Sequence, residues 1–282
     1  MSARTSSQRA VRAPTSASEL FGDYAAGPSR ALQASVRDLR PLVSGVDVDG
    51  FCSGAAVMVS HGPHDRWDAD EMGKRTVAFV FDGVRAADAA LVDLALRERE
   101  RGEGIDVSNL GGYHSRPDAF ERLGGCAAAL RATVERACEA CWDAVRGDAK
   151  SVWVKAMMGA GDPTKVTTSW ANVCERTNGH GLHNHVNAVW SGVYYASDGR
   201  DAETTPREDV DEPGDLLIRV TAGGLDPLSE GPSGYCSYMC VKPKVGRLVV
   251  FPSWVLHGVL ASAGDSPRVS YAFNTGEIGV KF

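Results

Sequence analysis

The sequence predicts a mainly β protein with flanking helices, an α+β arrangement. The first observation is a series of short segments after Gly147 that are rich in β-branched and aromatic residues, with no helical pattern between them. The second is helical spacing of apolar residues earlier in the chain. Many short strands in succession favour an antiparallel sandwich or barrel. The predicted strands are SVWVKAMMG, KVTTSWANVCE, AVWSGVYYA, GDLLIRV, GYCSYMCV, GRLVVF and PRVSYAFN.

Three regions follow along the chain. Residues 1–50 are expected to be a disordered leader, because Gly, Pro, Ser and Ala dominate the first part. Residues 1–18 lack acidic residues and contain three arginines, a composition also typical of an organelle transit peptide. Residues 51–150 are expected to form a helix-rich part that packs on the core. Residues 151–282 are expected to form the β core.

The elements of the middle region can be placed one by one. Residues 55–60 and 75–81 are predicted strands by their β-branched and aromatic content. Residues 84–101 carry an apolar stripe at i, i+3, i+4 spacing, which predicts a helix. A second helix is predicted through residue 145, and Gly124-Gly125 is expected to break or kink it near its start. Beyond the helices, residues 198–215 and 222–233 read as loops between strands.

Composition limits the classes of function. The net charge of -6 argues against a nucleic-acid or anionic-membrane surface, because such partners select basic patches. No apolar run is long enough to predict a transmembrane helix. The seven cysteines are odd in number and irregularly spaced, which favours a reducing compartment. We expect an intracellular protein, cytoplasmic or organellar if residues 1–18 are a transit peptide. Cys138 and Cys141 form a C-x-x-C inside a helical pattern and are expected to pack in the core.

Three histidines form the candidate metal site. His183 and His185 are separated by one residue, so strand alternation points both to the same face and Asn184 away. His257 lies far off in sequence, in another short apolar run. Imidazoles from two strands can occupy one face of an octahedral metal ion and leave positions for a substrate and O₂, as in non-haem Fe(II) oxygenases. We therefore predict that His183, His185 and His257 are metal ligands and the catalytic centre.

A candidate anion site follows His257 by eleven residues. Alternation aims Arg268 and Ser270 in the same direction on a predicted strand. A guanidinium group with a hydroxyl beside it is well shaped to bind a carboxylate. Its position on the strand after the third histidine gives this otherwise common pattern its weight.

At this point the chain resembles the 2-oxoglutarate/Fe(II)-dependent oxygenase superfamily. More narrowly, it is similar to a family whose members share an H-x-H…SGVYY motif and a late FPSW…H motif. The matching segments run from about residue 108 to the end of the chain: SNLGGYHS (108–115), SWANV (169–173), HNH (183–185), WSGVYY (190–195), GRLVVFPSWVLHGV (246–259) and RVSYAFN (268–274).

The resemblance implies a double-stranded β-helix core, also called a jelly-roll or cupin-like fold, that holds Fe(II). It implies that Arg268, assisted by Ser270, binds the distal carboxylate of 2-oxoglutarate, and that Asn172 and Tyr195 join the cosubstrate site. Strand alternation lets only one of Tyr194 and Tyr195 face a cavity. The implied partners are 2-oxoglutarate and O₂, with a primary substrate that the sequence does not identify. The implied reaction hydroxylates that substrate and releases succinate and CO₂.

One departure leaves alternatives open. The better-known members have an H-x-D pair, whereas His185 stands here in the position of the carboxylate. A three-histidine enzyme that uses no 2-oxoglutarate, either a cupin-type dioxygenase or a zinc hydrolase, is the first alternative, because zinc accepts three histidines and water. A non-catalytic binding module on the same fold is the second. Arg268 and Ser270 favour the oxygenase, since the other two have no need of them.

Overall fold

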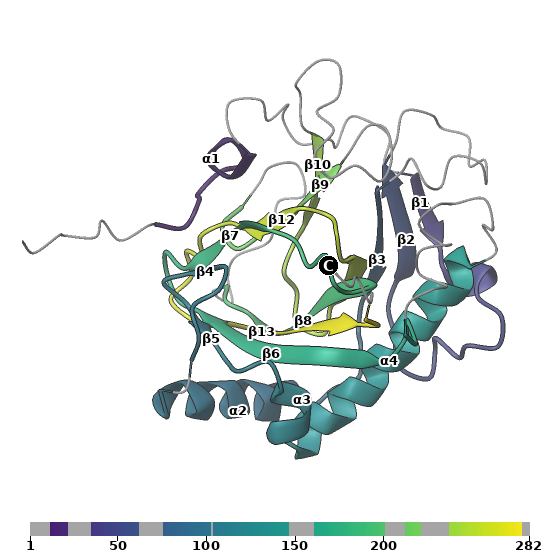
Figure 1. Ribbon diagram of the computed structural model, residues 1–282, viewed down its shortest axis with the longest axis horizontal. Helices are drawn as coiled ribbons and strands as arrows, with labels where there is room; N and C mark the ends of the chain where they lie inside the picture. The colour runs from purple at the N-terminus through teal and green to yellow at the C-terminus, as the bar shows by residue number, and fades with distance from the viewer. Residues whose placement is uncertain are drawn as a thin grey trace, which may run out of the picture.

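The computed structural model describes residues 12–21, 35–61, 76–102, 104–146, 161–200, 212–220 and 237–277. These residues form two antiparallel sheets that face each other (Figure 1). The large sheet has the strand order β1-β2-β3-β11-β8-β13-β6-β5. Its strands, in chain order, are β1 (Ser35–Asp38), β2 (Ala56–His61), β3 (Thr76–Phe81), β5 (Tyr113–His114), β6 (Val166–Cys174), β8 (Trp190–Asp198), β11 (Leu248–Pro252) and β13 (Arg268–Thr275).

The small sheet completes the core, with the strand order β10-β9-β12-β7-β4. Its strands are β4 (Asn109–Leu110), β7 (Gly179–His183), β9 (Leu216–Val220), β10 (Ser237–Val241) and β12 (His257–Val259). From β6 onward the chain passes back and forth between the two sheets, with β6, β8, β11 and β13 in the large one. This winding of one chain through two facing sheets is a double-stranded β-helix, so the predicted fold class is confirmed.

The helices cover the outer face of the large sheet (Figure 1). They are α2 (Asp88–Glu100), α3 (Ala119–Arg122) and α4 (Gly125–Val145), and the predicted break falls at Gly124, whose φ is +59°. Left-handed φ values favour glycine. The buried residues of α4 recur at helical spacing and pack on the sheet. Cys138 and Cys141 are among them, and burial raises the pKa of both thiols, so core packing describes this C-x-x-C.

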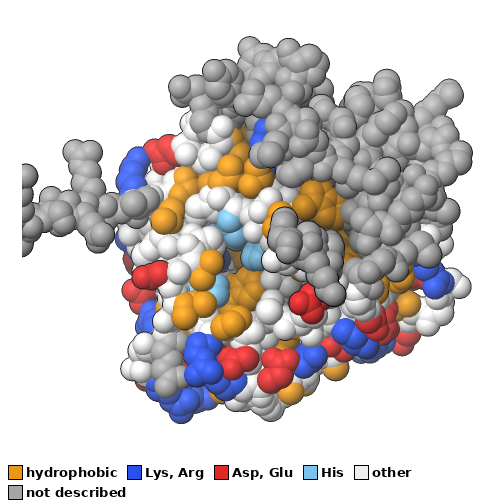
Figure 2. All heavy atoms as spheres, viewed as in Figure 1, with side chains coloured by type: hydrophobic (Ala, Val, Ile, Leu, Met, Phe, Trp, Pro, Cys, Tyr) orange, Lys and Arg blue, Asp and Glu red, His pale blue; other side chains and the backbone are white. Residues whose placement is uncertain are grey.

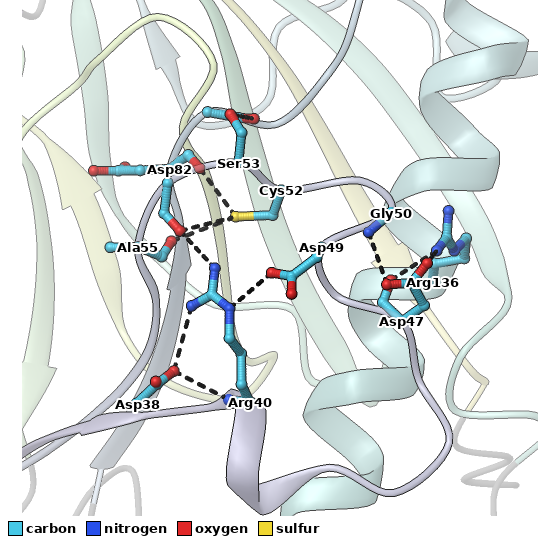
Figure 3. Close-up of polar contacts among 12 residues, drawn as sticks. Asp38, Arg40, Asp47, Asp49, Gly50, Cys52, Ser53, Ala55, Asp82 and Arg136 are labelled. Atoms are coloured by element: carbon cyan, nitrogen blue, oxygen red, sulfur yellow. Dashed lines mark hydrogen bonds and ion pairs between the residues drawn. The ribbon is translucent and has the colours of Figure 1, made fainter.

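The N-terminal region contributes strands to the same sheet. The 3₁₀ helix η2 (Arg40–Leu42) follows β1, which pairs with β2, and β3 pairs with β11. Arg40 ties this turn together, donating from Nε to Asp49 at 2.8 Å and from Nη2 to the Gly54 carbonyl at 2.7 Å (Figure 3). Arg136 of α4 donates to the Asp47 carbonyl at 2.7 Å. Residues 35–50, which the sequence assigns to a disordered leader, are thus paired and bonded to the fold.

A short helix, α1 (Ala17–Phe21), lies against the small sheet, where Phe21 stacks on Tyr238 with ring centroids 5.5 Å apart. None of the helices in the described ranges combines the length and apolarity that a bilayer crossing requires. The predicted strand at 151–159, most of the loop at 198–215 and the loop at 222–233 lie outside the described residues.

A buried ion pair joins two of the covering helices. Glu98 of α2 is 1% exposed, and Arg122 of α3 donates to it. Arg122 also donates from Nε to Asp118 at 2.8 Å. The exposed Arg101 lies 3.9 Å from Glu98. A carboxylate with so little contact with water depends on its partner, because an unpaired buried charge is costly.

We expect Arg122→Leu to lower the free energy of unfolding by about 3 kcal/mol, because it leaves the Glu98 carboxylate buried without its close partner. Denaturant unfolding followed by circular dichroism measures this. The control is Arg97→Leu, the same change at an exposed position of α2, which is expected to cost less than about 0.5 kcal/mol. Equal losses for the two variants would contradict a special role for the pair.

Candidate metal and cosubstrate site

The three predicted ligands come together between the two sheets. One ligand atom from each of His183, His185 and His257 lies within 4.8 Å of the other two. The ring centroids are 4.3 Å apart for His183 and His257, 5.1 Å for His183 and His185, and 5.3 Å for His185 and His257. Among the residues that the structure describes, these histidines form the group of three His, Cys, Asp or Glu side chains that lie close enough together to hold one metal ion.

Strand pairing positions two of the three rings. His183 is the last residue of β7, His257 is the first residue of β12, and the two are paired in register. His185 lies beyond the end of β7, so strand alternation is not what places it. Its backbone N–H donates to the Ser253 carbonyl at 2.8 Å, and the neighbouring Asn184 side chain donates to the Trp254 carbonyl at 3.2 Å. These bonds turn the chain so that His185 faces the site.

Backbone carbonyls orient the rings of His183 and His257. Nδ1 of His183 lies 2.8 Å from the Gly181 carbonyl oxygen, and Nδ1 of His257 lies 2.9 Å from that of Val255. A carbonyl only accepts, so each Nδ1 carries the proton and each Nε2 keeps its lone pair. The hydroxyl of Ser108 lies 3.3 Å from Nε2 of His183. Both rings therefore present a lone pair for a metal ion.

Burial keeps the three imidazoles neutral. It is the largest cause that lowers the pKa of His183, His185 and His257, and it brings the pKa of His185 to about 4. Mutual repulsion among the rings lowers the pKa values of His185 and His257 further. Neutral imidazole is the form that binds metal. Three neutral ligands leave the full charge of a divalent ion to attract an anion.

The same cavity contains the predicted anion site on the large sheet. Ser270 of β13 is paired in register with Asn172 of β6 on one side and Tyr195 of β8 on the other. All three side chains line the cavity, as does Arg268, two residues before Ser270. The cavity has about 530 Å³ of space not filled by atoms, counted to its open mouth. The structure thus brings every predicted ligand and cosubstrate residue to one cavity.

Arg268 and Asn172 keep polar atoms available to a ligand. Arg268 is 2% exposed and donates from Nη1 to the Gly214 carbonyl at 2.7 Å. Among the described residues, no carboxylate lies within ion-pair distance of it. Oδ1 of Asn172 is buried and has no hydrogen-bond partner in the described part of the chain. Buried polar groups are usually paired, so Arg268 fits an anionic ligand, and Oδ1 of Asn172 fits a bound hydrogen-bond donor.

Alternation separates the two tyrosines as predicted. Tyr195 lines the cavity, and burial raises its pKa to about 12, so its hydroxyl is a donor at neutral pH. Tyr194 faces the helices on the other side of the sheet and donates to Asp88 of α2.

Other residues line the cavity without a role predicted for them. His180 lies within β7, is buried, and has Nε2 3.7 Å from Sγ of Cys174. Trp170 stacks on His185 and on His114, with ring centroids 5.5 and 5.3 Å away. Ser108 also lines the cavity, and the sequence indicated it only through the SNLGGYHS motif. Within that motif β4 pairs with β7 and β5 pairs with β6, so the segment joins the two sheets.

A second, more open hollow adjoins the cavity at His185, which lines both. Figure 2 shows histidine side chains at a hollow in this face of the molecule, among hydrophobic side chains. The polar residues that line the second hollow are Thr167, Thr168, Asn184, Asn187, Asn274 and Glu277. His185 is therefore the ligand candidate whose ring has an outer side facing polar groups and solvent.

The donor set fits a divalent metal ion and a dicarboxylate. Residues 168–274 match the family described as "Putative 2OG-Fe(II) oxygenase". No curated protein sequence matches the chain.

Among solved structures, the chain is similar to a prolyl-4-hydroxylase from Pseudomonas putida, with 16% identity, a TM-score of 0.47, and coverage of 73% of this chain and 96% of that one. It is also similar to a Trichoplax adhaerens prolyl hydroxylase in complex with a hypoxia inducible factor peptide fragment. That pair has 11% identity, a TM-score of 0.45, and coverage of 74% of this chain and 87% of that one. A third similar structure is HygX from Streptomyces hygroscopicus with nickel and 2-oxoglutarate bound, with 13% identity, a TM-score of 0.45, and coverage of 72% of this chain and 83% of that one. The resemblance inferred from the motifs is confirmed by the family match: over residues 168–274, this chain has the sequence pattern of the 2OG-Fe(II) oxygenase family.

Proposed function

We propose that this protein is a 2-oxoglutarate- and Fe(II)-dependent oxygenase that hydroxylates a primary substrate and releases succinate and CO₂. One observation carries the proposal. Three neutral imidazoles share a cavity with Arg268, a buried cation whose described surroundings contain no carboxylate partner. The imidazoles suit a divalent metal, and the cation suits the far end of an anion that also reaches the metal.

The chain's own side chains have distinct tasks in this proposal. His183, His185 and His257 hold Fe(II) through ring nitrogens. When bound together, Fe(II), 2-oxoglutarate and O₂ supply the oxidising chemistry. Arg268 binds the distal carboxylate of 2-oxoglutarate with charge-assisted hydrogen bonds, and the Ser270 hydroxyl adds a donor on the same face.

The remaining polar residues of the cavity orient the cosubstrate and exclude water. Asn172 lines the cavity, and its buried Oδ1, which has no partner among the described residues, can accept a hydrogen bond from a donor bound there. Tyr195 offers a protonated hydroxyl in the same row as Ser270. Leu216 and Phe251 make part of the wall apolar, which strengthens the polar contacts inside.

The main alternative is a three-histidine metalloenzyme that uses no 2-oxoglutarate. The triad alone is compatible with zinc and water or with a cupin-type dioxygenase. Such an enzyme gives no reason to bury Arg268 in the same cavity. A non-catalytic module gives no reason to retain either set of groups.

We expect His257→Ala to weaken Fe(II) binding by at least about 100-fold, because it removes one of the three ligands. The protein should stay folded, because the substitution leaves the backbone of β12 in place. Anaerobic Fe(II) titration with a competing chelator gives the affinity, and circular dichroism checks the fold. His114→Ala serves as the matched control, since His114 is buried nearby but is not part of the triad. Unchanged Fe(II) affinity in His257→Ala would remove this residue from the site.

We expect Arg268→Ala to weaken 2-oxoglutarate binding by about 100-fold, because charge-assisted hydrogen bonds contribute about 1.5–3 kcal/mol each. Calorimetry on the Mn(II)-loaded protein without O₂ measures the affinity, and Mn(II) binding is expected to stay within a few-fold of the wild type.

The compound 2-oxobutanoate is the matched ligand control, because it keeps the metal-binding end of 2-oxoglutarate and lacks the distal carboxylate. Wild-type protein should prefer 2-oxoglutarate to 2-oxobutanoate strongly, and Arg268→Ala should lose that preference. A variant that weakens both ligands equally would show that Arg268 does not recognise the distal carboxylate.

A further inference from the structure

His185 differs from the other two histidines in the group that contacts its Nδ1. His183 and His257 each have Nδ1 next to a backbone carbonyl, which fixes the proton on Nδ1. Nδ1 of His185 instead lies 3.4 Å from the side-chain amide of Asn274, on β13. An amide offers either an acceptor or a donor, so here the tautomer of the ligand depends on which way a side chain is turned.

The present arrangement of Asn274 leaves His185 in the tautomer that does not bind metal through Nε2. Nδ2 of Asn274 faces Nδ1 of His185, while its Oδ1 accepts from the Ser191 hydroxyl at 2.7 Å. A donor facing Nδ1 requires a lone pair on Nδ1, which puts the ring proton on Nε2. With Nδ1 turned to Asn274 and a proton on Nε2, no lone pair is left for an ion.

Turning the amide over reverses this and loses no hydrogen bond. Nδ2 also donates to Oγ1 of Thr168 at 3.0 Å. Both neighbours of the amide, Ser191 and Thr168, are hydroxyls, which can donate or accept. In the turned orientation Nδ2 donates to Ser191, and Oδ1 accepts from Thr168 and from Nδ1–H of His185.

The ring itself stays in place during this change. Trp170 stacks on His185, with the centroids 5.5 Å apart and the planes at 26°, and the His185 backbone is anchored to Ser253. The proton on Nε2 is released to solvent as one is taken up at Nδ1, so the imidazole remains neutral. The polar hollow that Asn274 and His185 both line gives water access for this exchange.

We propose that Asn274 is a positioning residue that selects the metal-binding tautomer of His185, with Oδ1 turned toward Nδ1 whenever a metal ion is held. The inference rests on the proposed metal site and adds to it a residue outside the ligand set. It makes His185 the adjustable ligand of the three. A rotatable side chain contacts Nδ1 of His185, whereas backbone carbonyls contact Nδ1 of His183 and His257.

The direct test is the tautomer of His185, read from ¹⁵N chemical shifts and long-range ¹H–¹⁵N correlations of the histidine rings. Zn(II) is used because it is diamagnetic. In the metal-free protein, His185 should carry its proton on Nε2, in whole or in part, and His183 and His257 on Nδ1. With Zn(II), all three should carry it on Nδ1.

Variants separate selection of the tautomer from simple packing. Asn274→Asp keeps an acceptor toward Nδ1 in either orientation, so it should bind Zn(II) at least as tightly as the wild type. Asn274→Leu has a similar size and no acceptor, and should bind Zn(II) about 10- to 100-fold more weakly in chelator competition. Asn187→Leu, the same change at another amide of the same hollow, should bind Zn(II) as the wild type does.

Two results would overturn the proposal, and they differ from failure of the site. If Asn274→Leu bound Zn(II) normally with an unchanged His185 tautomer, Asn274 would have no such role. If Asn274→Asp weakened binding as much as Asn274→Leu, packing and not the acceptor would be what matters. If the wild type bound no metal through His183 and His257, the proposed function itself would fail, and the inference with it.

Discussion

The antiparallel register of β7 and β12 is the constraint on which the site depends. It sets His183 opposite His257, so two imidazoles project from adjacent strands of the small sheet toward the large one. Side chains alternate between the faces of a strand, so a slip by one residue would send either ring to the other face. The loop after β7 then needs only a few backbone bonds to bring His185 to the same point.

The large sheet supplies the complementary half of the cavity by the same rule. Tyr195, Ser270 and Asn172 are neighbours in register across β8, β13 and β6, so they form one row on the inner face. The helices α2, α3 and α4 cover the opposite face and fix the sheet's position. Enclosure between the sheets has two electrostatic effects. It keeps the imidazoles neutral, and it places the guanidinium of Arg268 where a carboxylate would be its natural partner.

A mainly β core could be predicted from the sequence, because its short segments are rich in β-branched and aromatic residues. The β-helix itself followed from the family resemblance that the H-x-H, SGVYY and FPSW motifs carry. Strand alternation correctly predicted that only one of Tyr194 and Tyr195 faces the cavity, and the structure shows that it is Tyr195. Strand alternation did not predict that His185 lies beyond the end of β7. That position depends on hydrogen bonds to the backbone carbonyls of Ser253 and Trp254, nearly seventy residues away. The β1 strand was missed because four residues beside a Pro- and Gly-rich segment give too short a pattern. Asn274 ends the RVSYAFN segment, but no sequence pattern indicated its contact with His185, because that contact depends on tertiary packing.

The central claim is that Fe(II) and 2-oxoglutarate meet in this one cavity. The most direct measurement is an anaerobic titration of the metal-free protein with Fe(II) and then 2-oxoglutarate, followed by visible absorption. A 2-oxo acid that chelates iron gives a metal-to-ligand charge-transfer band, whereas iron or the acid alone does not. The account predicts that the band appears only when both are present. Fe(II) bound without any band on addition of 2-oxoglutarate would contradict it and favour a three-histidine enzyme of another class.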